Sequence, residues 1–278
     1  MAGIPNVRLS LPNEPENVLV VRQMLSGLAE ALDIEPALLN SLSAAVSEAC
    51  NNVVLHAYEG RRGPLEVEVY GSPTALRVLV CDQGLGFSEP GEREADGLEV
   101  GGIGLLTIDA LSERVEIRSR VPAGTEVEME FWNREPAELE QPAAWSELTQ
   151  PFADTQVLVE ISPVELGRTI LPRLLSALAA RAHFPIDRIS ETMLLADALP
   201  SAVQQLAPRR QLRVAINGGP RKLELLIGPL GSGHANALMG DLSVEGIGSL
   251  LGRITNAQSI IALDSQETLA LQLAAASR

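Results

Sequence analysis

Residues Asn40 to Gly60 are predicted to form a helix with two distinct faces. On one face Glu48, Asn52 and His56 follow one another at intervals of four residues, so their side chains stack in a polar row. A carboxylate and a carboxamide one turn apart suit a general base and a cation ligand, although an ordinary amphipathic helix with a polar edge would show the same spacing. The apolar face is built by residues at helical spacing, namely Leu42, Ala45, Val46, Ala49 and Val53.

Two glycine-containing turns come later in the chain. An apolar, strand-like run leads directly into Asp82, Gly84 and Gly86, whose glycines let the backbone turn sharply and lie against a ligand. The Asp82 carboxylate is placed to accept a hydrogen bond from an exocyclic amine such as that of adenine. Gly102 and Gly104 then open a helix whose N-terminus offers backbone N–H groups to phosphate. Each cluster alone is a turn more often than a ligand site, but the three motifs in this order favour a nucleotide site.

These motifs resemble the nucleotide-binding boxes of the GHKL ATPase superfamily. The four boxes match, in order, Glu48-x-x-x-Asn52, Asp82-x-Gly84-x-Gly86, Gly102-x-Gly104 and Gly124-Thr125. Within the superfamily, the stretches SEACNNVVLHAYEG and GGIGLLTIDALSERVEI look most similar to the anti-sigma-factor serine kinases of bacteria. The resemblance covers about Val7 to Trp132. It implies an α+β fold, a two-layer α/β sandwich with a mixed, mostly antiparallel sheet and helices on one face.

The resemblance also implies the chemistry of an ATP-dependent protein serine kinase that uses Mg²⁺. Glu48 would be the general base that accepts the proton of the attacking hydroxyl, from a serine or from water. Asn52 would hold Mg²⁺, and Asp82 would select adenine. The remaining nucleotide-binding residues would be Gly84, Gly86, Gly102, Gly104, Leu105, Thr125 and Arg93.

Two further residues are assigned by position. Arg93 is the only basic residue in 87–100, which resembles the flexible lid of GHKL proteins, a plain surface loop being the alternative. Arg22 is similar in place to an arginine through which the anti-sigma kinases contact their partner protein. We interpret His56 as a helix-end packing or capping residue, because nothing in the chain resembles the helix pair that carries the phosphorylated histidine of histidine kinases.

Two classes of function stay open at this point. The first is a serine kinase that regulates transcription through protein partners, a sigma factor and its antagonist. The second is a docking module that uses ATP only to set its shape, or not at all. The presence of Glu48 favours the enzyme.

The second half of the chain repeats the pattern of the first. Residues 134–155 contain three prolines and little periodicity, which predicts a linker between domains at 1–133 and 156–278. Beyond the linker, Gly231-Ser232-Gly233 falls where Gly84-Leu85-Gly86 did, and a later glycine pair also recurs. We infer a tandem duplication, with an unrelated α/β domain as the alternative. The second copy would replace a partner subunit, giving a pseudo-dimer within one chain that is monomeric in solution.

The predicted copy has lost the chemistry of the first half. Asp197 stands at the position of Glu48, Ser201 at that of Asn52, and Pro229 at that of Asp82. Pro200 lies between the first two and is expected to break or kink its helix. The second domain is therefore predicted to be a degenerate, non-binding ATPase-like domain.

Composition narrows the partners and the compartment. Residues 1–133 carry 9 Arg against 21 Asp and Glu, which argues against nucleic acid or an anionic membrane as partner. No apolar run reaches the ~18 residues that span a bilayer, and the N-terminus lacks a signal-peptide pattern. The two cysteines, Cys50 and Cys81, are predicted to be free thiols in a reducing cytoplasm. The three histidines lie far apart in sequence, which makes a histidine–cysteine metal site improbable.

Overall fold

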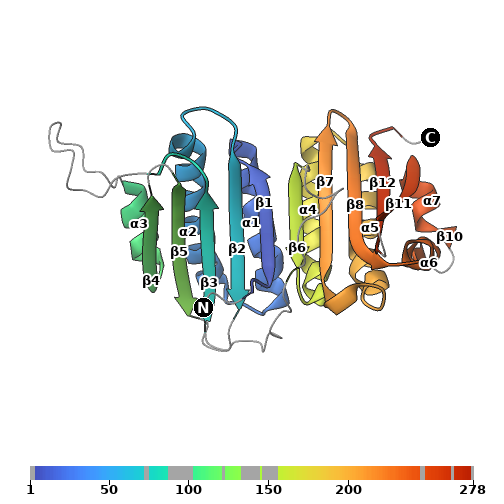
Figure 1. Ribbon diagram of the computed structural model, residues 1–278, viewed down its shortest axis with the longest axis horizontal. Coiled ribbons are helices and arrows are strands. Elements are labelled where there is room, and N and C mark those ends of the chain that lie inside the picture. The colour runs from blue at the N-terminus through green and yellow to red at the C-terminus, as the bar shows by residue number, and fades with distance from the viewer. Residues whose placement is uncertain are drawn as a thin grey trace. The chain divides into compact units, whose positions relative to one another are not determined.

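The computed structural model of the chain (Figure 1) describes residues 4–71, 75–86, 103–120, 123–132, 145, 156–244, 248–263 and 266–276. The chain divides into two compact units, one made mainly of Arg8–Leu139 and the other mainly of Glu140–Arg278. The domain limits 1–133 and 156–278 stay a prediction, since Trp145 is the one described residue between them. Within the described ranges, no helix is both long and apolar enough to cross a bilayer.

The first unit is an α+β sandwich whose helices lie on one face of its sheet (Figure 1). In strand order β1-β2-β3-β5-β4, the pairs β2–β3, β3–β5 and β5–β4 are antiparallel. This is the fold class that the sequence motifs implied. The elements in chain order are β1 (Val7–Pro12), α1 (Pro15–Ala31), α2 (Pro36–Asn52), the π-helix η1 (Val53–Ala57), β2 (Pro64–Gly71), β3 (Ala75–Asp82), α3 (Ile103–Leu111), β4 (Arg114–Arg120) and β5 (Gly124–Trp132).

Hydrophobic periodicity explains why these segments form their elements. Every second side chain of β1 is buried, and β2 shows the same alternation over most of its length, as a strand with one covered face requires. The predicted apolar face of α2 is confirmed, because all five of its residues are buried. Burying one such aliphatic side chain contributes about 1.5–3 kcal/mol, so the face turned to the sheet fixes the helix and its polar row.

Asn13 precedes α1 but does not cap it. Glu14 occupies the cap position without a side-chain hydrogen bond, and Pro15 supplies the first helical residue. The Asn13 side chain instead accepts a hydrogen bond from Gly63 N–H (2.8 Å) and donates one to the carbonyl of Arg61 (3.0 Å). The Asn13 side chain is therefore bonded to a loop that is distant in sequence and does not cap the helix that follows it.

The second unit has the same order of strands. Its main sheet runs β6-β7-β8-β12-β11, which matches β1-β2-β3-β5-β4 strand by strand, and β9 and β10 form a separate small sheet. This agreement supports the predicted duplication, which itself stays a prediction. The elements are β6 (Val157–Ile161), η2 (Val164–Leu166), α4 (Gly167–Arg181), α5 (Ile186–Val203), η3 (Pro208–Arg210), β7 (Leu212–Gly219), β8 (Lys222–Gly231), α6 (His234–Asp241), β9 (Ser243–Val244), β10 (Gly248–Ser249), α7 (Leu250–Ile254), β11 (Ala257–Leu263) and β12 (Gln266–Ala274).

Pro200 does not break its helix, so that prediction is wrong. Helix α5 runs through Pro200 to Val203, and the Pro200 carbonyl still accepts a hydrogen bond from Gln204 N–H (3.0 Å). A proline has no N–H to donate to the carbonyl four residues earlier, yet the helix continues for three residues beyond Pro200. Its ring is buried against Gly167, whose missing side chain leaves room for it.

Candidate functional site

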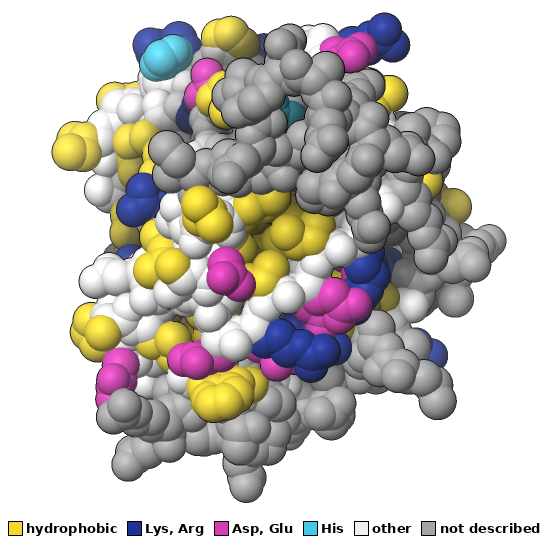
Figure 2. All heavy atoms as spheres, turned by 90° about the vertical axis from the view of Figure 1, so that its left-hand side faces the viewer, with side chains coloured by type: hydrophobic (Ala, Val, Ile, Leu, Met, Phe, Trp, Pro, Cys, Tyr) yellow, Lys and Arg dark blue, Asp and Glu magenta, His cyan; other side chains and the backbone are white. Residues whose placement is uncertain are grey.

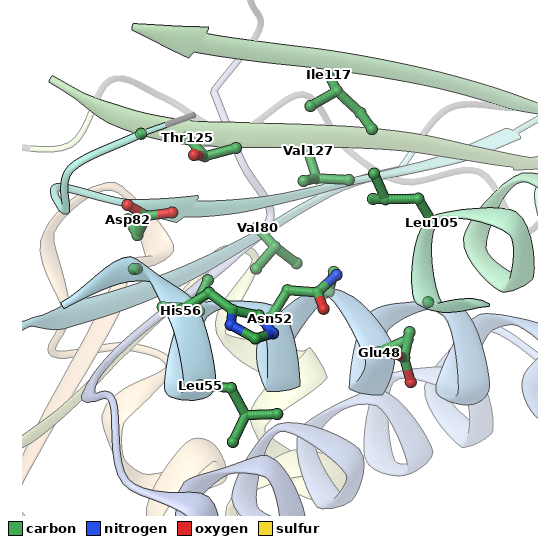
Figure 3. A pocket seen from close by; sticks show the side chains of 15 residues that line it. Glu48, Asn52, Leu55, His56, Val80, Asp82, Leu105, Ile117, Thr125 and Val127 are labelled. Carbon is green, nitrogen blue, oxygen red and sulfur yellow. The ribbon is translucent and has the colours of Figure 1, made fainter. Parts of the chain in front are cut away.

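A cavity of about 430 Å³ in the first unit brings most of the predicted site residues together. A volume of this size is typical of small-molecule sites. The end of the unit seen in Figure 2 shows apolar side chains gathered in a hollow. Figure 3 shows the cavity between the α2–η1 segment on one side and the sheet on the other. The predicted residues that line it are Glu48, Asn52, Asp82, Gly86, Gly104, Leu105 and Thr125.

The polar row of α2 forms one wall of the cavity. Glu48, Asn52 and His56 all line it, with the first two half-buried and His56 exposed near its edge (Figure 3). The Glu48 carboxylate lies so close to Gly104 that any side chain at that position would overlap Oε1. Glycine at the start of α3 therefore lets this helix approach the carboxylate.

The α-helix α2 becomes a π-helix within the segment that lines the cavity. Directly after Asn52, the chain continues as the five-residue π-helix η1, a form that often occurs at functional sites. The Ala57 carbonyl at its end accepts a hydrogen bond from Leu85 N–H (3.0 Å). Gly84 packs so tightly on the same carbonyl that a side chain there would collide with it. This explains in physical terms why residue 84 is a glycine.

Asp82 lies at the end of β3, across the cavity from α2 (Figure 3). The residue is 8% exposed, and its Oδ1 accepts a hydrogen bond from Gly84 N–H (2.7 Å). Burial raises the pKa of the Asp82 carboxyl, while hydrogen bonds from Gly84 and Thr125 partly oppose the rise. Gly124, at φ +89°, leaves no room for a side chain beside the Asp82 carbonyl, so β5 can bring Thr125 next to the carboxylate.

The helix α3 forms the remaining wall. Gly104 and Leu105, in its first turn, line the cavity, and an N-terminal turn presents backbone N–H groups that attract anions. Gly102 and Arg93 lie outside the described residues. Among the described lining residues, no lysine or arginine is present and the acidic groups are Glu48 and Asp82.

Arg22 lies apart from this cavity. It is exposed on α1 and is not among the lining residues. The cavity therefore does not test the predicted role of Arg22 in binding a partner protein, which stays a prediction.

Sequence reasoning missed Tyr58, which follows η1. Its hydroxyl accepts a hydrogen bond from Gln83 N–H (2.8 Å) and donates one to the Pro64 carbonyl (2.6 Å). No spacing in the sequence links residue 58 to residue 83, and only the folded chain brings them together.

The matching end of the second unit is built differently. Asp197 and Ser201, at the positions predicted for Glu48 and Asn52, are both exposed. Val80 pairs with Val127 in the first unit and Ile227 pairs with Leu269 in the second, so Glu267 precedes Leu269 by two residues as Thr125 precedes Val127. The register shifts between Glu267 and Leu269, and Glu267 pairs with Leu230. The Glu267 carboxylate accepts hydrogen bonds from Gly233 N–H (2.8 Å) and Ala235 N–H (3.0 Å) at the start of α6. These donors lower the pKa of Glu267.

Comparison with known proteins identifies relatives of the segment that contains this site. Residues 11–131 match the family model of the histidine kinase-like ATPase domain. Serine-protein kinase RsbW of Bacillus licheniformis is 34% identical over 142 residues, which are 46% of this chain and 87% of that protein. The chain belongs to the RsbW family of serine-protein kinases. RsbW of Bacillus subtilis is 30% identical over 41% of this chain and 78% of its own length, and RsbW of Listeria monocytogenes is 34% identical over 40% and 78%.

Family membership confirms the resemblance found in the motifs. The matched residues 11–131 contain both the polar row of α2 and the loop after β3, and they lie within the first unit. The GHKL-type ATPase fold is therefore established for the first unit.

Proposed function

We propose that the first unit binds ATP in the cavity and transfers its terminal phosphoryl group to a serine of a partner protein. The observation that carries the proposal is the convergence of Glu48, Asn52 and Asp82 with the start of α3 on one cavity. Nothing in their sequence spacing alone requires three separate elements to meet there. Serine-protein kinase activity is also what the names of the relatives describe.

The two ends of the cavity suit the two ends of ATP. Asp82 is a buried carboxylate acceptor whose lone pairs beyond those used by Gly84 and Thr125 can receive the exocyclic amine of adenine. The first turn of α3, with Gly104 and Leu105, would hold the phosphates through backbone N–H groups, joined by Gly102 and Arg93 from the neighbouring segment. A base end and a phosphate end on different elements give the nucleotide one orientation.

The donor set near α2 fits a magnesium ion shared with a triphosphate. Asn52 offers one carboxamide oxygen, a ligand type that Mg²⁺ accepts, and Mg²⁺ at phosphate sites takes few protein ligands. The described part of the chain contains no cluster of three or more His, Cys, Asp or Glu side chains that could hold a metal ion. A magnesium ion shared with a triphosphate does not require one, because the phosphates supply ligands of their own. When bound, the ion would neutralise phosphate charge, and Asn52 would hold it.

Glu48 is placed to act on the incoming hydroxyl. Its half-buried carboxylate lies one turn before Asn52 and against Gly104, at the phosphate end of the cavity. As the serine oxygen forms its bond to the terminal phosphorus and the bond to ADP breaks, the Glu48 carboxylate would take the serine proton. Since phosphoryl transfer needs little covalent help from the protein, positioning would supply most of the rate.

The biological role we propose is regulation of transcription through a sigma factor and its antagonist, the serine-bearing partner. Its support is the resemblance of residues 7–132 to anti-sigma-factor kinases, with Arg22 as the partner contact. The two free thiols, Cys50 and Cys81, whose pKa burial raises to about 12, fit the reducing cytoplasm where we expect the protein to act.

We further propose that the second unit binds no nucleotide and serves as a docking platform that stands in for a second subunit. The observation in favour is Glu267, whose carboxylate already fills the start of α6. A pseudo-dimer of this kind predicts a monomer by sedimentation. A stable homodimer would count against it.

An equilibrium titration with Mg²⁺ and a non-hydrolysable ATP analogue tests the central proposal. We expect one binding site per chain in the wild type, and a much weaker site in Asp82→Asn. Phosphoryl transfer from labelled ATP to candidate partner proteins then tests the reaction. Two sites per chain would contradict the account of the second unit, and no binding would leave a docking regulator as the better reading of the whole chain.

A further inference from the structure

The backbone N–H groups of residues 83–85, directly after Asp82, are all hydrogen-bonded within the protein. Gln83 N–H donates to the Tyr58 hydroxyl (2.8 Å), Gly84 N–H to Asp82 Oδ1 (2.7 Å) and Leu85 N–H to the Ala57 carbonyl (3.0 Å). Three successive backbone donors therefore have protein partners. The protein itself therefore holds the backbone of residues 83–85, and the Asp82 side chain lines the cavity.

Tyr58 is the one side chain among these partners that comes from outside the loop. Its hydroxyl accepts from Gln83 and donates to the Pro64 carbonyl (2.6 Å), so it joins the loop to the start of β2. Its ring packs against Gly63, where any side chain would overlap it. Burial is the main reason that the pKa of Tyr58 is raised, so the hydroxyl keeps the proton it donates at neutral pH.

The Tyr58 contact fixes the peptide that directs the Asp82 side chain. Gln83 N–H and the Asp82 carbonyl belong to the same peptide unit, which is planar. Tyr58 holds the N–H side of this unit, and Gly124 packs closely against its carbonyl side. With both sides of the peptide held, the backbone of Asp82 and Gln83 is restrained, which keeps Gly84 N–H in place to hold the carboxylate in one direction.

We propose that Tyr58 is a positioning residue, which pre-orders the Asp82 loop so that its carboxylate is ready for the adenine amine. The proposal rests on the proposed ATP site, because it assigns Tyr58 to the base end of that site. A pre-ordered loop spares the ligand the entropy of ordering it, which increases affinity and sharpens the choice of base.

The chain offers a matched control for the test, since it contains two tyrosines. Tyr58→Phe removes the hydroxyl but keeps the ring on Gly63. Tyr70→Phe removes a hydroxyl that donates to Glu68 within β2 and is not part of the cavity wall. The loss of one hydrogen bond corresponds to a change of about threefold to tenfold in an equilibrium constant.

We expect Tyr58→Phe to weaken ATP binding by about threefold to tenfold and to narrow the preference for ATP over inosine triphosphate, which has a carbonyl in place of the amine. Because the phosphate end is untouched, the rate of transfer at saturating ATP should stay close to wild type, while KM rises. Tyr70→Phe should leave affinity, base preference and KM unchanged. Equal affinity and base preference in Tyr58→Phe and wild type would overturn the proposal.

Amide hydrogen exchange by NMR, without nucleotide, separates this proposal from the function on which it rests. We expect the Gln83 and Leu85 amides to be protected in wild type and Tyr70→Phe, and the Gln83 amide to exchange several-fold faster in Tyr58→Phe. Equal exchange at Gln83 in wild type and Tyr58→Phe would overturn the role of Tyr58 even if ATP binds. A wild type that binds no ATP but shows the expected exchange would overturn the proposed function and leave the ordering of the loop intact.

Discussion

The two units share a strand order but differ in what lies at the start of the first described helix after the third strand. In the first unit α3 opens onto the cavity, and Gly104 and Leu105 line it. In the second unit, α6 starts against Glu267, which accepts hydrogen bonds from Gly233 and Ala235. The second unit thus fills the start of this helix with a carboxylate of its own chain.

The sheets of the two units also differ in how many of their faces are buried. Side chains of β1 and β2 alternate between buried and half-exposed positions, whereas all five residues of β6 and the first five of β7 are buried. The additional buried face carries an ion pair between Glu160 and Arg213 (2.6 Å), with Trp145 over the guanidinium. Beside the pair lie cross-strand neighbours that are each 5% exposed or less, namely Leu158, Ala215, Leu226 and Ala270.

This contrast shows how one topology supports two purposes. The first unit keeps an open cavity with unneutralised carboxylates, an arrangement that costs stability but suits a ligand. In the second unit the counterparts of Glu48 and Asn52 are exposed, the Glu267 carboxylate is hydrogen-bonded at the start of α6, and both faces of the first strands are buried. Fold alone does not assign function, which depends on the side chains placed on it.

The largest expected effect is on catalysis in the first unit. Glu48→Gln keeps the size of the side chain but removes the base, so phosphoryl transfer should fall by about 10²–10⁴-fold. Binding of the ATP analogue should change little, since Asp82 and α3 carry the proposed nucleotide contacts. The matched control is Glu59→Gln, an exposed glutamate just beyond η1. Transfer at the wild-type rate in Glu48→Gln would remove Glu48 from the mechanism.

The two sheets should respond very differently to the loss of one carboxylate. Glu160→Leu leaves the Arg213 guanidinium, 3% exposed, without its closest carboxylate and should cost about 3–5 kcal/mol in the free energy of unfolding. In the first unit, Glu116→Leu breaks a pair with Arg118 in which both side chains are 45% exposed, and about 0–1 kcal/mol should be lost. Denaturant unfolding measures both, and similar losses would contradict the contrast between the faces.

The contrast between the two sheets was not predicted, although the sequence contains a signal of it. Alternation in VRLSLP and near-continuous apolar residues in VLVEI already distinguish a strand with one buried face from one with two. The motif residues were predicted, because glycines that permit close approach and a polar row on a helix leave local signals. Most of the predicted site residues indeed meet at one cavity.

The features that were missed depend on which distant segments come together. Asn13 bonds a loop near residue 62 instead of its own helix, and Tyr58 meets Gln83 across the fold. In the sequence, Glu267 looks like an ordinary surface glutamate. Only the pairing of β12 with β8 brings it to the start of α6. Pro200 is accommodated inside α5 with its ring packed on Gly167, a residue from another helix. Local propensity contains none of this tertiary information.

Asp82 connects binding and stability, so its replacement should move them in opposite directions. Because burial raises its pKa, the folded protein binds the proton more tightly than the unfolded chain does, and the ionised form lowers stability at neutral pH. That cost disappears as the pH falls through the raised pKa towards the unfolded value of about 3.9. Asp82→Asn keeps an acceptor for Gly84 N–H and should be at least as stable as wild type at pH 7, with no advantage in acid.

ATP affinity of Asp82→Asn should nevertheless fall by about tenfold to a hundredfold, because the amine loses a charged acceptor. Thermal unfolding between pH 4 and pH 8, together with the analogue titration, measures both effects on the same samples. A variant that binds ATP normally would move base recognition away from Asp82. A variant less stable than wild type at neutral pH would show that the buried charge is better compensated than its surroundings indicate.

The smallest expected effect concerns the Glu267 carboxylate of the second unit, which lies at the start of α6. Glu267→Ala frees the N–H groups of Gly233 and Ala235, so its melting temperature should be slightly lower, and inorganic phosphate should restore part of the loss by binding there. Gln266→Ala, at the exposed neighbouring position of β12, should show neither change. In the wild type, the lowered pKa of Glu267 means that its contribution is present above the unfolded value of about 4.3 and is lost as the pH falls through the folded one. If phosphate stabilises wild type and Glu267→Ala equally, the carboxylate does not occupy an anion position, and the second unit must be silent for another reason, such as the missing counterparts of Glu48 and Asn52.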